Sequence, residues 1–239
     1  MKKGIEKSLS LVIPAHNAAK VLNQSVIEYY QLFSQCMEQL EIIVVCNACT
    51  DDTVAIAQEL AKTFPLKVLN IPHRGKGNAL IRGFNLASYE RMGFLDCDNP
   101  FSLEKMKQML QELDKVDIAI ASKYLRGSFK HKKGVRDSNL RRIIALGGQC
   151  ISFTVFGLTF RDTQAGAKFF RKTVWQRLGK TMTCVGFDFD IELLYKAKKH
   201  KYSIAEFYTP LVKVEKFSTV RVKYLAGMLY RLFKMRFFG

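Results

Sequence analysis

The chain has no long apolar run. None of its 239 residues belongs to a stretch approaching the roughly 20 apolar residues that a membrane-spanning helix needs. The first apolar run, at residues 9–14, is also too short for the core of a signal peptide. Low-complexity tracts and internal repeats are absent. We therefore expect a globular cytoplasmic protein in which any membrane contact is peripheral.

Disulfide and zinc frameworks are not indicated either. The six cysteines are scattered along a chain that is long enough to bury a full core. Cys46 and Cys49 form a C-x-x-C pair, but no second Cys/His pair stands at zinc-ligand spacing. Reduced thiols are favoured over a redox or zinc site.

Acidic residues are scarce. Asp and Glu total 21 against 38 Lys and Arg, which gives a net charge of +17, and no acid follows Glu215. This balance favours anionic partners such as nucleotides, phospholipid head groups, phosphorylated lipids or nucleic acid. The chain has no recognisable DNA-reading helix or RNA-binding aromatic signature, so nucleic acid is not expected as a partner.

The first half of the chain alternates strand and helix patterns. Short apolar runs predict strands at 9–13, 41–45, 66–71 and 92–95, and helical spacing predicts helices at 18–39, 50–62 and 77–89. This order predicts an α/β fold with a mainly parallel twisted sheet, covered by helices on both faces.

The second half is less regular. Its predicted elements are a strand near 118–120, a basic loop at 123–133, a helix at 141–156, a polar turn at 162–166, a helix opening at 186–190, and a strand at 203–214 bent at Pro210. We expect one domain at 1–220, with a nucleotide-binding half to about residue 100, followed by a basic amphipathic tail at 221–239.

Polar residues follow four of the predicted strands, namely His16-Asn17, Cys46-Asn47, His73-Arg74 and Asp96-Cys97-Asp98. Ligands of parallel sheets bind at the carboxyl ends of the strands, so these clusters predict a site along one edge. Asp96 and Asp98 together can approach a hard cation such as Mg²⁺ or Mn²⁺, which neutralises a diphosphate leaving group. The alternative for this pair is a solvated turn.

A second anion-binding feature is the sequence Arg74-Gly75-Lys76-Gly77-Asn78, which precedes a predicted helix. Its glycines permit close approach of the backbone, and the helix amino end and Lys76 favour a phosphate. The spacing is not that of a P-loop. A flexible surface turn is the alternative.

Several segments together carry a resemblance: residues 11–17, 42–53, 74–80 and 96–98, then 122–124, 162–170 and 186–194. In order and separation they resemble the family-two glycosyltransferases of the GT-A fold, and the later segments resemble the polyprenyl-phosphate (dolichyl-phosphate) mannose and glucose synthases. The similarity covers about residues 9 to 220.

The resemblance implies a role for each matching position. Asp96 and Asp98 would hold the metal, and Asp162 and Asp190 would lie beside the sugar at the reaction centre. Lys123, with Arg141 or Arg142, would contact donor or acceptor phosphates. The nucleotide-sugar would be bound by Pro14, His16, Asn17, Asn47, Asp51, Lys76 and Asp96.

Three positions depart from the family pattern. Cys46-Asn47 stands where Asp-Asp is frequent, His16 where Tyr is common, and Lys123 where Arg is frequent. The identity of the donor's nucleobase therefore stays open, and bidentate phosphate binding is lost at Lys123.

The implied reaction is a single in-line displacement at the anomeric carbon, with inversion. A phosphate acceptor is already ionised near neutral pH, whereas an alcohol would need Asp162 or Asp190 as a base. For Asp188 and Asp190, helix capping is the alternative role.

Two basic segments remain. Residues 123–142 carry eight Lys or Arg and one acid, a pattern that fits either a solvated face or a segment closing over phosphates. The tail has apolar residues at helical spacing among its cations, which fits an interfacial membrane helix or a helix packed on the domain or a partner. Its apolar positions are Leu225, Met228, Leu229, Leu232, Phe233, Phe237 and Phe238.

The leading hypothesis is an inverting transferase that moves a hexose from a nucleotide-sugar donor, a UDP- or GDP-hexose, to a polyprenyl phosphate at the inner membrane face. One alternative is transfer to a saccharide acceptor in cell-surface polysaccharide assembly. Another, of a different class, is a non-catalytic module that binds membranes or nucleic acid.

Overall fold

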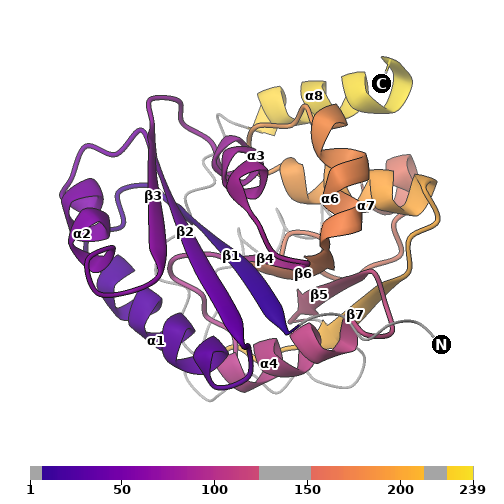
Figure 1. The fold of residues 1–239 in the computed structure, drawn as a ribbon. Coiled ribbons are helices and arrows are strands. Elements are labelled where there is room, and N and C mark those ends of the chain that lie inside the picture. The colour runs from indigo at the N-terminus through magenta and orange to yellow at the C-terminus, as the bar shows by residue number, and fades with distance from the viewer. Residues whose placement is uncertain (1–6, 124–151, 213–224, 239) are drawn as a thin grey trace.

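The computed structural model describes residues 7–123, 152–212 and 225–238. Predictions for the basic loop beyond Lys123, for Arg141 and Arg142, and for residues 213–214 lie outside these ranges. Within them the chain forms one mixed sheet flanked by helices (Figure 1).

The sheet has seven strands in the order β3-β2-β1-β4-β6-β5-β7. Four neighbouring pairs are parallel, and β6 is antiparallel to both β4 and β5. The prediction of a mainly parallel sheet is therefore confirmed. The strands are β1 (Ser8–Ala15), β2 (Gln39–Asn47), β3 (Leu66–Ile71), β4 (Arg91–Leu95), β5 (Ile118–Ser122), β6 (Ala167–Arg171) and β7 (Ile204–Tyr208).

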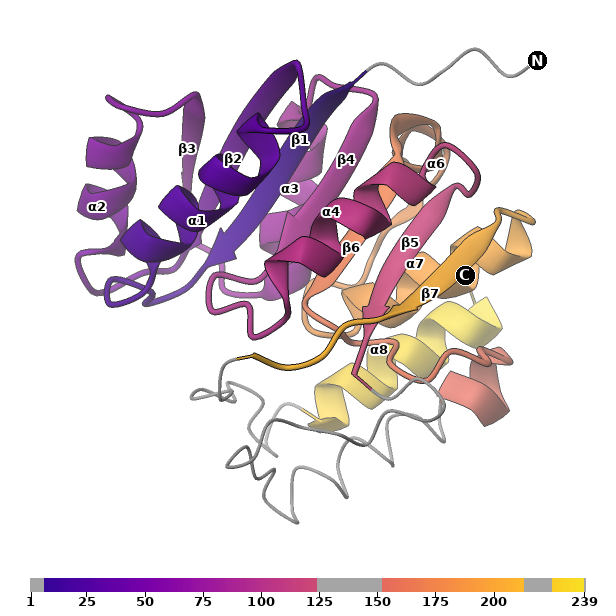
Figure 2. The same ribbon diagram turned by 90° about the horizontal axis from the view of Figure 1, so that it is seen from below.

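Helices cover both faces of the sheet, as Figures 1 and 2 show. One face is covered by α1 (Leu22–Ser34), α2 (Thr53–Leu60) and α4 (Leu103–Glu112). The other is covered by α3 (Lys76–Leu86), α6 (Lys172–Leu178) and α7 (Phe189–Lys199), with α8 (Leu225–Phe238) packed beyond them. A 3₁₀ turn at Gly179–Thr181 follows α6, and residues 152–156 are also helical.

Strand alternation divides the core into two layers. In β1, Leu11 and Ile13 face the layer under α1, whereas Val12 faces the layer under α3. Both layers are apolar because both faces of the sheet are covered, which explains why the central strands read as continuous apolar runs.

The hydrophobic pattern predicts the first-half elements well, although the helices at 50–62 and 77–89 are shorter than expected, as Thr53–Leu60 and Lys76–Leu86. The expected helix at 18–39 ends at Ser34, because Gln39 already begins β2. The pattern does not predict α4, β6 or α6. Strand β6 is concealed by Lys168, a fully buried lysine within its apolar run, which a buried-strand pattern would not contain.

Candidate active site

Four predicted polar clusters do follow the carboxyl ends of β1 to β4, which lie side by side in the sheet. The parallel strand β5 ends at the same edge, and the antiparallel β6 begins there, since its Ala167 pairs with Leu95 of β4. The topology thus brings Asp96, Lys76 and the 162–167 segment together, although they are far apart in the chain.

The turn that carries Asp96 and Asp98 is fixed from two sides. From α1, the hydroxyl of Tyr29 donates to the Asp96 carbonyl at 2.7 Å and that of Ser25 donates to the Cys97 carbonyl. From the other side, the Asp96 amide donates to the Gly166 carbonyl at 2.8 Å. A Cβ on Gly166 would lie 2.2 Å from an Asp96 carboxylate oxygen, so only glycine permits this approach.

At the centre of the edge lies a cluster of two lysines and two aspartates. Lys76 Nζ lies 3.0 Å from Asp96 Oδ1 and 3.4 Å from Asp190 Oδ2. Lys168 Nζ lies 2.5 Å from Asp190 Oδ1 and donates to the Ala165 carbonyl at 2.8 Å. Both carboxylate oxygens of Asp190 are thus engaged by lysines. We call these four residues the charge cluster.

Three of the four side chains of the charge cluster are buried, and the fourth, that of Asp96, is 30% exposed. The side chains of Lys168 and Asp190 are 0% and 1% exposed, and both ammonium groups lie over the ring of Phe94. Burial lowers the pKa of a lysine, but Asp190 and Asp96 outweigh it and raise the pKa of Lys76 above its usual value. For Lys168, burial prevails over Asp190, and its pKa is lowered. The cluster holds opposite charges in a fixed geometry.

Asp162 lies in a second buried position, joined to β5 and β7. Its carboxylate accepts the Lys123 amide at 3.3 Å, and its own amide donates to Glu206 Oε1 at 3.0 Å. Burial raises the pKa of Asp162, and the charges of Lys123 and Lys168 only partly oppose that rise. Lys168 therefore lies within electrostatic reach of both predicted catalytic aspartates.

The residues predicted to border the nucleoside lie in the loops after β1 and β2. His16 Nδ1 lies 2.7 Å from the Asn47 carbonyl, and the Thr50 amide donates to Asn17 Oδ1 at 2.8 Å. Asp51 accepts the Ala19 amide at 3.2 Å. Burial opposes ionisation of Asp51, but hydrogen bonds from Thr53 and Ala19 prevail and lower its pKa. The two loops are thereby joined, with half-buried Pro14 at the end of β1 beside them.

Asn47 joins this region to the amino end of α3. It donates to the Ala15 carbonyl at 2.9 Å and accepts the Gly75 amide at 3.3 Å, so both ends of its amide bind backbone groups. The neighbouring Cys46 is buried, and burial raises the pKa of its thiol to about 12. Its thiolate is therefore scarce at neutral pH.

The chemistry of the donor set fits a divalent cation shared with a substrate. Asp96 is half-buried and Asp98 is exposed, so both follow β4 where solvent and ligand have access. Among the described residues no group of three or more His, Cys, Asp and Glu could enclose a metal alone. One or two carboxylates completed by phosphate oxygens and water is the usual arrangement for Mg²⁺.

Lys168 is a site residue that sequence reasoning missed. Its signals were an unexplained lysine in the apolar run of residues 165–170 and its place in the segment 162–170 that carries the resemblance. Asp188 occupies the N-cap position of α7 as the capping alternative expects, but its side chain makes no cap hydrogen bond to that helix. Asp188 instead binds Arg231 of α8, with Nε to Oδ2 at 2.5 Å.

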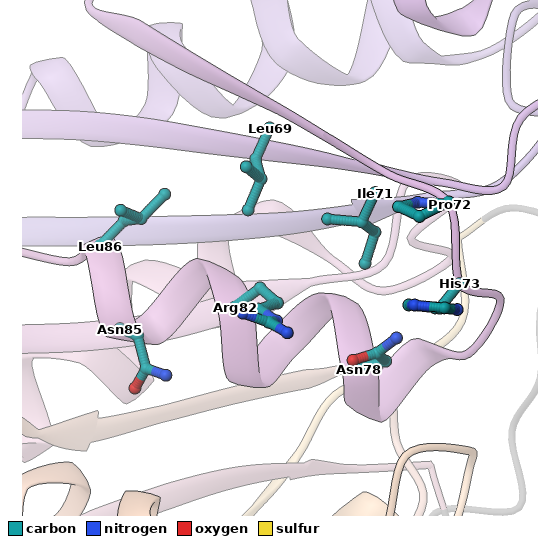
Figure 3. A pocket seen from close by; sticks show the side chains of 8 residues that line it. All are labelled: Leu69, Ile71, Pro72, His73, Asn78, Arg82, Asn85 and Leu86. Carbon is teal, nitrogen blue, oxygen red and sulfur yellow. The ribbon is translucent and has the colours of Figure 1, made fainter.

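A separate groove of about 420 Å³ lies between β3 and α3 (Figure 3). Asp96, Asp98 and the lysines of the charge cluster do not line it, and we assign it no role. Its lining residues are Leu69, Ile71, Pro72, His73, Asn78, Arg82, Asn85 and Leu86.

Solved structures share this architecture. Glucosyl-3-phosphoglycerate synthase from Mycobacterium tuberculosis, in complex with UDP, aligns with 95% of this chain and 78% of its own at a TM-score of 0.67. The identity is 18%, so the likeness concerns the fold, which is that of the GT-A glycosyltransferases.

Curated relatives are more similar in sequence. A dolichyl-phosphate beta-glucosyltransferase of Drosophila melanogaster is 28% identical over 83% of this chain. A polyprenol monophosphomannose synthase of Mycolicibacterium smegmatis is 28% identical over 70% of it. The chain covers 65% of the length of each of these relatives.

The family model described as "Glycosyl transferase family 2" matches residues 10–178, from within β1 to the end of α6, and this range includes Asp162 and Lys168. That match spans well over half of the 239 residues. The chain therefore belongs to glycosyl transferase family 2.

Proposed function

We propose that this protein transfers a hexose from a UDP- or GDP-hexose to a polyprenyl phosphate, with inversion at the anomeric carbon and release of the nucleoside diphosphate. The observation that carries the proposal is that Lys76 forms ion pairs with both Asp96 and Asp190 at the edge of the sheet where the parallel strands end. Asp98 is exposed in the turn after β4 that also carries Asp96. The lipid-phosphate acceptor is supported by the names of the dolichyl- and polyprenol-phosphate relatives.

Mg²⁺ or Mn²⁺ is the proposed cofactor. Asp96 and Asp98 would hold it, and it would supply positive charge to the leaving diphosphate. Neighbouring structures of the M. tuberculosis synthase contain Mg²⁺ or Mn²⁺ together with UDP or UDP-glucose, which supports this choice. Lys76 adds a fixed positive charge beside Asp96, where a diphosphate bound to the same turn would lie.

The aspartates have different proposed roles. Asp190 binds a lysine with each oxygen, so it is suited to holding Lys76 and Lys168 in place rather than to accepting a proton. Asp162 has a raised pKa and lies beside Lys123, and we place it at the acceptor side. Since a phosphate acceptor is already ionised near neutral pH, the displacement needs no strong base.

The loops after β1 and β2 form the proposed nucleoside site. His16 and Asn17 lie on the β1 loop, and Asp51 secures the β2 loop against it. Both ends of the Asn47 side-chain amide already bind backbone groups. We therefore propose that Asn47 shapes the base pocket and makes no hydrogen bond to the nucleobase itself.

Membrane contact is proposed to be peripheral. Among the described residues, no helix is long and apolar enough to cross a bilayer. Helix α8 turns Leu232 and Met235 into the core and leaves Tyr230, Phe233 and Phe237 exposed. The apolar tail is thus divided between a face that packs on the domain and a face suited to an anionic interface.

The test of the function is a screen of UDP- and GDP-hexoses against a polyprenyl phosphate with Mn²⁺ or Mg²⁺. We expect one donor to release its nucleoside diphosphate while a glycosylated lipid forms in equal amount. Product with a saccharide acceptor alone would favour polysaccharide assembly, and no product with either acceptor would reject the transferase.

Replacing both Phe233 and Phe237 by aspartate is expected to weaken binding to anionic vesicles at least about tenfold, because the change removes exposed apolar surface and adds two like charges. Flotation with phosphatidylglycerol vesicles measures this binding. Leu86→Asp, which changes an exposed apolar residue on α3, serves as the control and should bind normally. Unchanged flotation of the double variant would rule out this face.

A further inference from the structure

Asp188 is a buried carboxylate whose charge is matched from a distant part of the chain. Its side chain is 0% exposed, and it binds the guanidinium of Arg231 with Nε to Oδ2 at 2.5 Å and Nη2 to Oδ1 at 3.3 Å. The Gly186 amide donates to the same Oδ1 at 3.0 Å. The bidentate pair thus fixes the segment at residues 184–188 to α8.

The same segment binds the amino end of α3. The Gly77 amide donates to the Gly186 carbonyl at 3.1 Å, and the Asn78 amide donates to the Val185 carbonyl at 2.9 Å. First-turn amides have no partner within their own helix, so these carbonyls satisfy them. The contact is tight, because a Cβ on Gly77 would lie 2.4 Å from the Cys184 carbonyl oxygen.

Lys76 is the first residue of α3, directly before these two amides. Its ammonium lies between Asp96 and Asp190 in the charge cluster. A shift of the segment at residues 184–188 would therefore move the helix end from which Lys76 extends. The same segment leads into α7, which carries Asp190.

We propose that Arg231 is a positioning residue: it holds the segment at residues 184–188 against α3 and thereby sets the position of Lys76 in the charge cluster. This inference rests on the proposed transferase function for its effect on turnover, but its structural part is independent of that function. It assigns α8 a role on its inner face that is separate from lipid contact on its outer face.

The test compares Arg231→Met, which keeps the bulk of the side chain, with the wild type. Hydrogen exchange should be at least about tenfold faster at the Gly77 and Asn78 amides in the variant, and kcat at least about tenfold lower, since small misplacements of a catalytic group are costly. Arg231→Lys should restore part of both. Vesicle binding should stay within about twofold of wild type.

Two further variants separate positioning from general damage. Arg231→Met combined with Asp188→Asn removes the unpaired buried charge, so stability should recover while kcat stays low. Arg171→Met is the matched control, because Arg171 binds the Leu113 carbonyl at 2.8 Å and faces Asp117 away from the charge cluster. Its kcat should be unchanged.

Normal exchange at Gly77 and Asn78 in Arg231→Met would overturn the proposal, whether or not the wild type transfers sugar. Faster exchange with unchanged kcat would also overturn it, because the position of Lys76 would then not depend on Arg231. Recovery of kcat in the double variant would overturn it as well, because Arg231 would then only neutralise Asp188. A wild type that transfers no hexose rejects the proposed function alone, and amide exchange still decides the role of Arg231.

Discussion

Replacing Asp98 by alanine is expected to lower turnover of the nucleotide sugar at least about 100-fold, because a metal on the leaving diphosphate would lower the reaction barrier by several kcal/mol. Asp98 is exposed, so the fold should tolerate the change with little loss of stability. The measurement is the release of nucleoside diphosphate at saturating Mn²⁺. Removal of metal from the wild type with EDTA should produce a comparable loss, which added Mn²⁺ reverses.

The control for this variant is Glu59→Ala, which removes another exposed carboxylate from a surface pair with Lys62. Its turnover should equal that of the wild type, since such pairs contribute little. Turnover by Asp98→Ala close to that of the control would contradict a metal site at the turn after β4. The remaining role for Asp96 would then be to hold Lys76 in place through their ion pair.

The second large effect is expected at Lys168. Exchanging it for methionine leaves Asp190 buried with one lysine instead of two, and breaking a buried pair from one side costs about 3–5 kcal/mol of the free energy of unfolding. Urea denaturation followed by circular dichroism measures this loss. Activity should fall as well, because Lys76 shares the same carboxylate.

A double variant separates the two consequences. Lys168→Met with Asp190→Leu replaces the pair by apolar side chains, which is often neutral for stability, so most of the lost free energy should return. Activity should not return, because Lys76 has lost one of its two carboxylates. Recovery of turnover with stability would show that Asp190 has no part in the reaction.

The first half of the fold could be predicted because its strands and binding edge are indicated by residues that are adjacent in the sequence. Continuous apolar runs such as 42–45 identify strands buried on both faces, and polar residues directly after them identify the binding edge. That pattern places Asp96 at the binding edge, and the turn at residues 74–78 separately indicates an anion site around Lys76. Their contact at 3.0 Å is a finding of the structure that neither pattern predicts.

The second half was harder to predict because its strand pairing and its ion pairs join residues that are far apart in the sequence. An antiparallel β6 between β4 and β5 is set by tertiary pairing and leaves no period in the sequence. Lys168 is stable in that strand only because Asp190, 22 residues later, compensates its charge. The bond between Asp188 and Arg231 spans 43 residues and has no sequence signal.

The inner face of α8 has a consequence for protein production. A shortened protein cut before residue 225, made to improve solubility, would lose Leu232 and Met235 from one core layer and Arg231 from Asp188. It would expose apolar surface and leave a buried carboxylate without its cation, two changes that promote aggregation and low yield. An inactive preparation of that kind would say nothing about lipid binding, so the tail belongs in every preparation used for enzymology.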